Sequence, residues 1–315
     1  MMNQKTSSLQ SSPSSLFLWG IDLGGTKIEA AIIDPTHRDI ALYRRRIPTE
    51  AEKGYEHILN QIEKLIQEVE KLSGMKRSSK IGFGTPGMIN PVTGLLQHAT
   101  NTPCLNQRPL KEDLEKALSV EVIIQNDANC FALAEATLGV ARGKKIVMGL
   151  ILGTGVGGGL VIDGHTIEGL NHIAGEWGHN RLCGEERFCG CGKRGCNETV
   201  FSGPALEQFY FELSGKKMPL SEIIKQAEEG EEAAQKTLQR LQEKFAEAIS
   251  VPINILDPDA IVIGGGVGNL DILYTEETRN QVVQYAVNKS LKTPFLKPIL
   301  GDSAGVFGAA LLTGV

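Results

Sequence analysis

Hydrophobic and polar residues alternate with two different periods along the chain, and these periods predict alternating strands and helices. Short apolar runs predict buried strands. They lie at residues 16–21, 28–33, 81–84, 120–125, 146–152, 160–162 and 260–267. Longer segments with an apolar side chain at every third or fourth position predict amphipathic helices. These lie at residues 53–73, 203–213, 220–229, 231–256 and 276–291, and a small apolar segment at 303–312 predicts a closing helix. This order of elements is typical of an α/β protein.

Two segments about half a chain apart share the order strand, glycine turn, strand, and a third strand also ends in glycines. Such a repeat predicts a duplicated fold. Glycine turns allow backbone N–H groups to approach a phosphate without a Cβ in the way. No turn has the spacing of a Walker A loop or of a dinucleotide-binding loop. The candidate nucleotide-binding residues are Asp22, Gly24, Gly25, Thr26, Lys27, Gly153, Thr154, Gly155, Gly264, Gly265 and Gly266.

Two side chains of the first turn carry charge. Asp22 could hold Mg²⁺ through water, because hard oxygen ligands suit this ion. Lys27 suits a phosphate contact, and a solvated turn lysine is an equally good interpretation. A single glycine turn is typical of an ordinary hairpin. The three turns together with Asp22 favour a nucleotide.

A cluster of one histidine and three cysteines predicts a metal site. His179, Cys189, Cys191 and Cys196 fall within eighteen residues of one another. One imidazole and three thiolates match a closed tetrahedral Zn²⁺ site, which is structural because no coordination position stays open. The alternative is a loop of free thiols beside a core histidine. A structural zinc would fix the loop that carries Glu176 and Glu198.

The composition is that of a soluble globular protein. The chain has 315 residues, of which 41% are hydrophobic and 22% charged, and its net charge is −5. This length predicts about two domains, and the charge argues against a general electrostatic affinity for nucleic acid. The longest uncharged stretch near the middle, residues 147–162, is too short to cross a bilayer. The Ser-rich residues 1–15 predict a disordered tail on a cytoplasmic protein.

The pair Asn126 and Asp127 ends one predicted strand and precedes residues 128–138, which have the composition of a helix. An aspartate at this point suits two roles. It is a common helix N-cap, and a carboxylate can also accept the proton of an attacking hydroxyl in phosphoryl transfer. The residues alone favour neither role.

These motifs together resemble the ROK family, which comprises bacterial sugar kinases and transcriptional repressors of the actin and hexokinase superfamily. The resemblance covers the chain from residue 16 onward. It rests on residues 22–27, 84–87, 126–129, 153–155, 176–179, the cysteine cluster with Glu198, and 264–266. Within the family the chain most resembles bacterial manno(fructo)kinases, through residues 175–180, 254–259 and 301–306.

The resemblance implies two ribonuclease H-like domains with Mg-ATP bound in the cleft between them. The N-terminal domain is expected at 16–125, joined by the C-terminal helix at 303–315, and the C-terminal domain with the zinc loop at 126–302. The implied reaction is ATP-dependent phosphorylation of the 6-hydroxyl of a hexose, first of all fructose, with mannose or glucose as further substrates. Asp127 is implied as the general base. The implied sugar-binding residues are Gly87, Asn101, Asn126, Glu176, His179 and Glu198.

Three further expectations complete this interpretation. The stretch between His179 and Cys189 is shorter than in manno(fructo)kinases, which predicts a smaller loop over the sugar. Twenty-one residues precede Asp22, too few for the helix-turn-helix domain of family repressors. The family commonly forms homodimers. A glucokinase or an N-acetylhexosamine kinase would share every motif, whereas a non-catalytic sugar sensor would not need Asp127.

Overall fold

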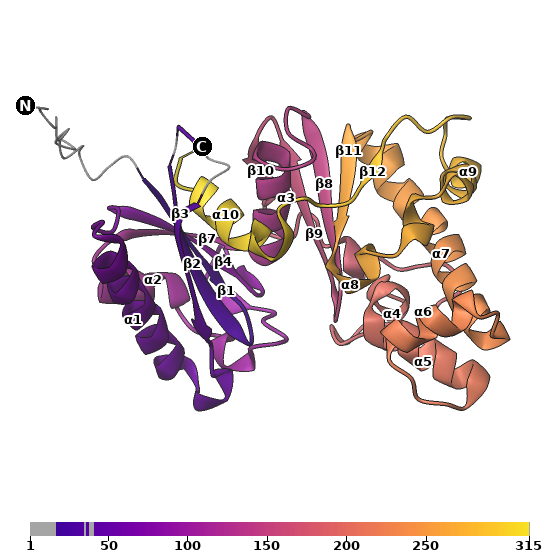
Figure 1. The fold of residues 1–315 in the computed structure, drawn as a ribbon, viewed down its shortest axis with the longest axis horizontal. Helices are drawn as coiled ribbons and strands as arrows, with labels where there is room; N and C mark the ends of the chain where they lie inside the picture. Colours follow the sequence, from indigo (N-terminus) through magenta and orange to yellow (C-terminus); the bar gives the residue numbers. More distant parts are fainter. Residues whose placement is uncertain (1–16, 35, 38–40, 315) are drawn as a thin grey trace, which may run out of the picture.

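Two five-stranded mixed sheets form the frame of the protein (Figure 1). The computed structural model describes residues 17–34, 36–37 and 41–314, so the predicted tail at 1–15 lies outside the described residues. The first sheet has the order β3-β2-β1-β4-β7 and the second β10-β9-β8-β11-β12. The strands of the first sheet are β1 (Leu18–Leu23), β2 (Lys27–Ile33), β3 (Ala41–Pro48), β4 (Lys80–Thr85) and β7 (Glu121–Asn126). Those of the second are β8 (Ile146–Leu152), β9 (Val156–Ile162), β10 (His165–Thr166), β11 (Ala260–Gly264) and β12 (Phe295–Leu296).

The two sheets share the order and the direction of their strands. In each sheet the first two strands form an antiparallel hairpin and the third extends it at the edge. The fourth and fifth strands of each sheet run parallel to the first. The hairpins β1–β2 and β8–β9 are the two units that the repeated glycine turns predict. The division into two duplicated domains stays a prediction.

Helices cover the outer face of each sheet, and two helices lie between the sheets (Figure 1). On the first sheet the outer helices are α1 (Tyr55–Ser73) and α2 (Leu110–Leu118). On the second they include α5 (Gly203–Ser214), α6 (Leu220–Glu228), α7 (Glu232–Leu256) and α9 (Glu276–Tyr285). The central pair is α3 (Asp127–Thr137) and α10 (Ala304–Leu311). The remaining elements are the short helices α4 (Glu198–Phe201) and α8 (Gly265–Gly268), the 3-10 turns Ala51–Lys53, Pro103–Leu105, Trp177–His179, Asp271–Tyr274 and Gly301–Ser303, and the small hairpin β5 (Met88–Ile89) with β6 (Leu96–Gln97). No helix among the described residues is long and apolar enough to span a bilayer.

Two predicted boundaries need correction. The helix predicted over 276–291 ends at Tyr285. Ala286 adopts an extended backbone conformation, and the backbone N–H of Val287 donates to the Asn254 side chain at 2.9 Å. The strand predicted over 260–267 ends at Gly264. Gly265 has a φ of 85° and turns the chain into α8, a conformation that glycine adopts without strain.

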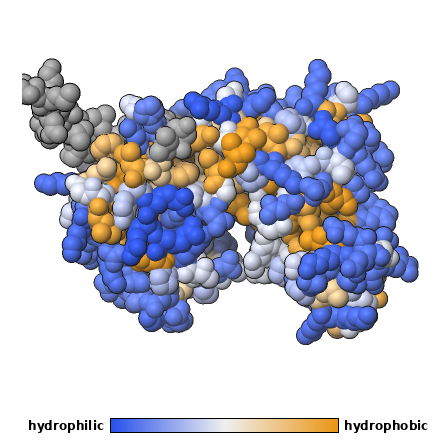
Figure 2. Space-filling model, in the orientation of Figure 1, coloured by the Kyte–Doolittle hydropathy of each residue, from blue (hydrophilic) through white to orange (hydrophobic). Residues whose placement is uncertain are grey.

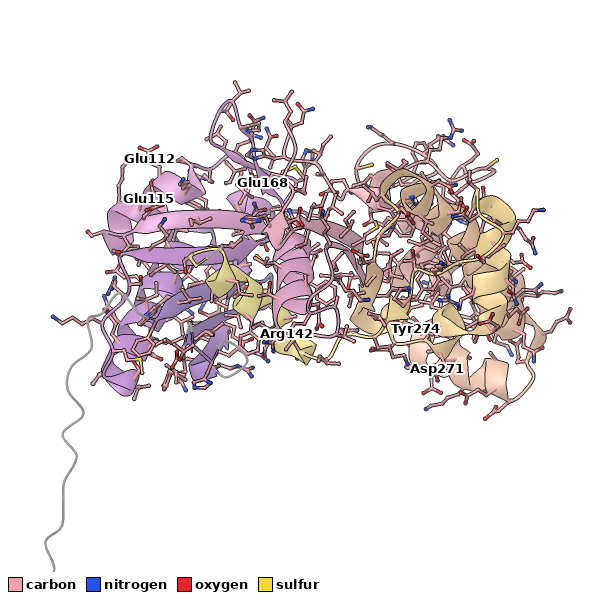
Figure 3. All side chains as sticks on the ribbon, turned by 90° about the horizontal axis from the view of Figure 1, so that it is seen from above. Glu112, Glu115, Arg142, Glu168, Asp271 and Tyr274 are labelled. Carbon is pink, nitrogen blue, oxygen red and sulfur yellow. The ribbon has the colours of Figure 1, made fainter. Side chains whose placement is uncertain are left out.

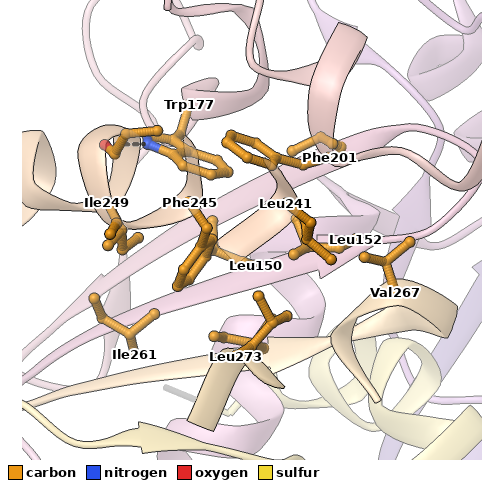
Figure 4. Packing of buried hydrophobic residues seen from close by; sticks show 14 of the residues in the cluster. Leu150, Leu152, Trp177, Phe201, Leu241, Phe245, Ile249, Ile261, Val267 and Leu273 are labelled. Carbon is orange, nitrogen blue, oxygen red and sulfur yellow. Dashed lines mark hydrogen bonds between the residues drawn. The ribbon is translucent and has the colours of Figure 1, made fainter. Parts of the chain in front are cut away.

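The outer core of the second sheet is aromatic. Trp177 stacks on Phe201 with ring centroids 5.3 Å apart, and Phe245 meets both rings edge-on (Figure 4). The Trp177 indole donates a hydrogen bond to the carbonyl of Ala248 on α7 at 3.1 Å. This packing fixes the start of the segment that carries Glu176 and His179, because Trp177 lies between them in the chain.

Small residues allow α3 and α10 to approach closely in the layer between the sheets. A Cβ on Gly308 of α10 would lie 1.8 Å from the backbone oxygen of Cys130 on α3, so only glycine permits this contact. On the other side, α10 packs on β1 and β4, where Gly20 and Gly82 face it. The close approach brings the glycine-turn ends of the two sheets to the same side of the molecule.

Candidate active site

A cavity of about 960 Å³ lies between the two halves of the molecule. The surface is hollowed between these halves at the lower edge of the view in Figure 2. One wall, the hairpin wall, comes from the β5–β6 hairpin and the residues after it. The other wall comes from the β8–β9 turn and the cysteine-rich loop, residues 189–196. The cavity brings together these predicted site residues: Gly87, Asn101, Asn126, Asp127, Gly153, Thr154, Gly155, Glu176, His179, Cys191 and Glu198.

Asp127 opens α3 at the end of β7, and its side chain is exposed to the cavity. The N-cap is the neighbouring Asn126, whose Oδ1 accepts from the backbone N–H of Ala128 at 2.8 Å. The capping role that the sequence allowed for Asp127 therefore belongs to Asn126. Asp127 Oδ1 also accepts from Ala128, at 2.7 Å. Asn126 Nδ2 donates to the carbonyl of Gly87 at 3.2 Å and so ties the end of β7 to the chain that follows the neighbouring strand β4.

The surroundings of Asp127 favour a carboxyl group that can exchange a proton near neutral pH. Removal from bulk water and the nearby charge of Glu176 raise the pKa of Asp127 to about 6, although the hydrogen bond from the Ala128 N–H opposes this rise. A base with a pKa close to the working pH suits proton transfer.

Asp22 lies at the end of β1, opposite Glu29 on β2 and close to Gly84 and Gly305. Burial, and after it the charges of Asp127 and Glu29, raise the pKa of Asp22 to about 7. The electrostatic effect shows that the two aspartates belong to one charged region, although Asp22 does not line the cavity wall. The negative charge of Asp127 disfavours ionisation of Asp22, because like charges repel.

The first glycine turn lies behind the cavity wall. A Cβ on Gly25 would lie 3.0 Å from the backbone oxygen of Asn101, which lines the cavity. Lys27 Nζ lies 3.7 Å from Asp302, an exposed partner, so the ion pair is weak. The structure therefore places Asp22, Gly24, Gly25, Thr26 and Lys27 beside the cavity and not on its surface.

The second and third turns lie together. Gly153 N donates to Gly155 O at 2.9 Å and closes the second turn, which lines the cavity. Gly265 approaches β8 so closely that a Cβ would lie 2.3 Å from the oxygen of Leu152, directly before that turn. Gly264, Gly265 and Gly266 support the second turn without lining the cavity.

Three side chains predicted to bind sugar gather at the wall formed by the second half. His179 Nε2 lies 3.7 Å from Glu176 Oε2, and Glu198 Oε2 accepts from the backbone N–H of Val156 at 3.0 Å. Burial raises the pKa of Glu176, while His179 and His98 oppose this change. The wall thus offers carboxylate acceptors and an imidazole, which suits a polyhydroxy ligand.

The four predicted zinc ligands meet, with all donor atoms within 4.8 Å of one another. Cys189 Sγ lies 3.6 Å from His179 Nδ1, and Cys191 Sγ lies 3.6 Å from Cys196 Sγ. A tetrahedral zinc with ordinary Zn–S bonds separates two sulfur ligands by about 3.8 Å. The donor set and its spacing therefore fit zinc, and His179 would bind it through Nδ1 while Nε2 faces Glu176.

The cavity also has lining residues that the sequence did not single out. They lie on the hairpin wall, before and after Asn101, and on the cysteine-rich loop. They include Gln97, His98, Thr100, Asn106, Gln107 and Lys193. The polar run around Asn101 was a signal for the first five, because a loop that follows a short hairpin commonly carries binding residues.

The fold and the cavity define a class: a sugar kinase with the α/β architecture of the actin and hexokinase type. A family model described as ROK family matches residues 18–314. The chain is 36% identical to the N-acetyl-D-glucosamine kinase of Photobacterium profundum over 93% of its own length and 98% of that protein. It is 37% identical to the N-acetyl-D-glucosamine kinase of Pasteurella multocida, with the same coverage. The chain belongs to the ROK family, and it is a phosphotransferase that acts on a sugar.

Solved structures agree with this assignment. The ROK hexokinase from Thermus thermophilus superposes with a TM-score of 0.83 at 30% identity, covering 94% of this chain and 97% of that one. A ROK family glucokinase from Streptomyces griseus, in complex with glucose and AMPPNP, gives a TM-score of 0.75 at 25% identity, covering 94% of this chain and 98% of that one.

The likeness to fructokinases needs correction. The curated relatives named above are N-acetylglucosamine kinases, and they match the chain over nearly its whole length. Of the three segments behind the fructokinase prediction, only 175–180 contributes residues to the cavity, namely Glu176 and His179. The three segments therefore identify the family and do not separate one sugar from another.

Proposed function

We propose that this protein transfers the γ-phosphoryl group of ATP to the 6-hydroxyl of N-acetylglucosamine. The observation that carries the proposal is the carboxylate of Asp127, which opens a helix at the cavity between the two sheets. The curated N-acetylglucosamine kinases support the choice of sugar, since they align over 93% of the chain. N-acetylhexosamine replaces fructose as the expected substrate.

In the proposed reaction the sugar hydroxyl attacks the γ-phosphorus in line with the bond to ADP. Asp127 accepts the hydroxyl proton as the new O–P bond forms and the bond to the β-phosphate oxygen breaks. The products are sugar 6-phosphate and ADP. Positioning contributes most to such a transfer, because its transition state needs little covalent assistance.

The remaining residues of the proposed site hold the two substrates. Asn101, Asn126, Glu176, His179 and Glu198 would bind the sugar hydroxyls, and Gly87 leaves room for the ring. The second glycine turn, which lines the cavity, would bind the phosphates of ATP, and the first and third turns beside it would reach them when the two halves close. Asp22 would hold Mg²⁺ through water, and Mg²⁺ neutralises charge on the β- and γ-phosphates when bound. Closure around the sugar would exclude water and limit ATP hydrolysis.

The domain boundaries belong to the same proposal. We place one domain at 16–125 together with the C-terminal helix, and the other at 126–302. The packing of α10 on β1 and β4 supports this division. A structural zinc, a homodimer and a cytoplasmic location stay predictions.

The test is ADP release with Mg-ATP at a fixed concentration and one sugar at a time. The panel holds N-acetylglucosamine, N-acetylmannosamine, glucose, mannose and fructose. We expect the highest kcat/KM with N-acetylglucosamine. A preference for glucose or fructose would overturn the choice of sugar and keep the kinase, whereas no turnover with any sugar would overturn the proposed reaction.

A further inference from the structure

A chain of polar side chains beside the cavity joins its two walls. Its central member is His172, on the loop between β10 and Glu176. His172 Nδ1 lies 2.9 Å from the carbonyl oxygen of Ile89 on β5. Because a carbonyl can only accept, Nδ1 carries the proton and donates. The bond links segments that are 83 residues apart in the sequence.

Both segments joined by this bond carry cavity-lining residues. Met88 precedes Ile89 and lines the cavity, and Ile173 follows His172 and lines it as well. The loop is closed on itself, because Ala174 N donates to Glu168 O at 3.1 Å. Any displacement of this loop would also move Glu176, only two residues after Ala174. The contact of His172 with Ile89 therefore sets the distance between the hairpin wall and the wall that carries Glu176.

The other side of the imidazole ring faces Glu168, whose Oε2 lies 3.3 Å from His172 Nε2 (Glu168 is labelled in Figure 3). A carboxylate also only accepts, so Nε2 donates to Glu168 when the ring carries a proton on both nitrogens. Glu168 Oε1 accepts a short hydrogen bond from Gln125 Nε2. Gln125 is buried on β7 and accepts from Asn129 Nδ2 of α3 at 3.1 Å. Gln125 directly precedes Asn126 and Asp127. The chain of contacts thus runs from the start of α3 to the β5–β6 hairpin.

We propose that His172 is a positioning residue that clasps the two walls of the sugar cavity through its hydrogen bond to Ile89, with Glu168 and Gln125 holding the ring in place. The clasp favours the arrangement in which both walls reach the sugar. Its loss lowers the fraction of molecules in that arrangement, and the apparent dissociation constant of the sugar rises by the same factor. The inference rests on the proposed function only in the identity of the sugar.

Three substitutions of His172 separate the clasp from general stability. Alanine removes both contacts. Asparagine keeps a donor where Nδ1 lies and so keeps the bond to Ile89, whereas glutamine keeps a donor where Nε2 lies and faces Glu168. His165→Ala is the matched control, because His165 is exposed on β10 and, among the described residues, its side chain bonds to the nearby carbonyl of Asp163 and to neither wall of the cavity.

We expect His172→Ala and His172→Gln to raise the sugar KM about five-fold, the effect of one net hydrogen bond. The kcat and the KM for ATP should stay within about two-fold, since the clasp does not touch the reacting groups. His172→Asn and His165→Ala should resemble the wild type. An unchanged sugar KM in His172→Ala, an equal rise in the KM for ATP, or equal behaviour of the asparagine and glutamine variants would overturn the clasp.

Titration calorimetry of the full chain with N-acetylglucosamine makes the same comparison without turnover. If the wild type binds this sugar but releases no ADP, the proposed reaction fails, and the clasp is still judged by the dissociation constants. If the wild type prefers another sugar of the panel, that sugar replaces N-acetylglucosamine in the titration. Dissociation constants that are equal in all four variants and the wild type would refute the clasp in either case.

Discussion

Replacement of Asp127 by asparagine tests the reaction most directly. Asparagine has nearly the same shape, and its Oδ1 can accept from Ala128 N as Asp127 Oδ1 does at 2.7 Å. The N-cap is unaffected, because Asn126 supplies it. The variant should therefore fold and bind sugar like the wild type, while it cannot accept a proton.

The size of the effect follows from the role of a general base. Such a base contributes about 10² to 10⁴ in rate, so kcat should fall by about that factor while the sugar dissociation constant changes less than about two-fold. The pH profile gives an independent check. Because the pKa of Asp127 is about 6 and the ionised form is active, the wild-type kcat/KM should rise up to about pH 6 and level off above it.

The assay is coupled ADP release between pH 5 and 9, with sugar affinity measured by calorimetry. Asp271→Asn is a suitable control, since this carboxylate is exposed and pairs with Lys297 away from the cavity. Turnover of Asp127→Asn above about a tenth of the wild-type value would refute the base, because the minimum effect of a base is larger. A rise in kcat/KM that persists in the variant near pH 7 would assign the titration to Asp22 instead.

Three further predictions concern the metal, the second aspartate and the core. Metal analysis should find about one zinc per chain, and chelation should lower the melting temperature and raise the sugar KM, because closed zinc sites contribute to folding. Asp22→Asn should stabilise the protein by about 4 kcal/mol at pH 8 and by only about 0.5 kcal/mol at pH 4, measured by urea unfolding. The sign follows from the raised pKa: the folded state holds a proton up to about pH 7, so wild-type stability falls as pH rises from about 4 to 7. Phe245→Ala should cost about 3 to 5 kcal/mol in the same assay, since Phe245 is fully buried among aromatic rings.

The sequence predicted the parts of the fold that depend on local pattern. The hairpins around the first two glycine turns, the amphipathic helix ending at residue 73 and the closing helix follow from periodicity and glycine placement. The prediction that this helix continues beyond Tyr285 was wrong, because the end of the helix depends on the side chain of Asn254, more than thirty residues away. Local pattern contains no information about such a partner.

The same distinction holds for the site. Asn126 and Asp127 follow directly after an apolar strand, and the second glycine turn joins two apolar runs, so these residues were predictable from local pattern. The clasp was not, because Glu168 and Gln125 are 43 residues apart and His172 is 83 residues from Ile89. His98 shows a third case: it lines the cavity with a φ of 62°, a conformation rare for a residue other than glycine, which no periodicity indicates.

The arrangement of α3 and α10 explains how the protein tolerates two carboxylates in one region. α3 begins at Asp127, and α10 begins beside Asp22, where a Cβ on Gly305 would lie 2.8 Å from Asp22 Oδ2. The N-terminus of a helix carries partial positive charge and favours a nearby anion. Each carboxylate therefore lies at the favourable end of one central helix, which offsets part of the rise in pKa that burial and neighbouring carboxylates cause. The small residues where α3 and α10 cross make this possible, because only a close crossing lets both helices begin in the same region.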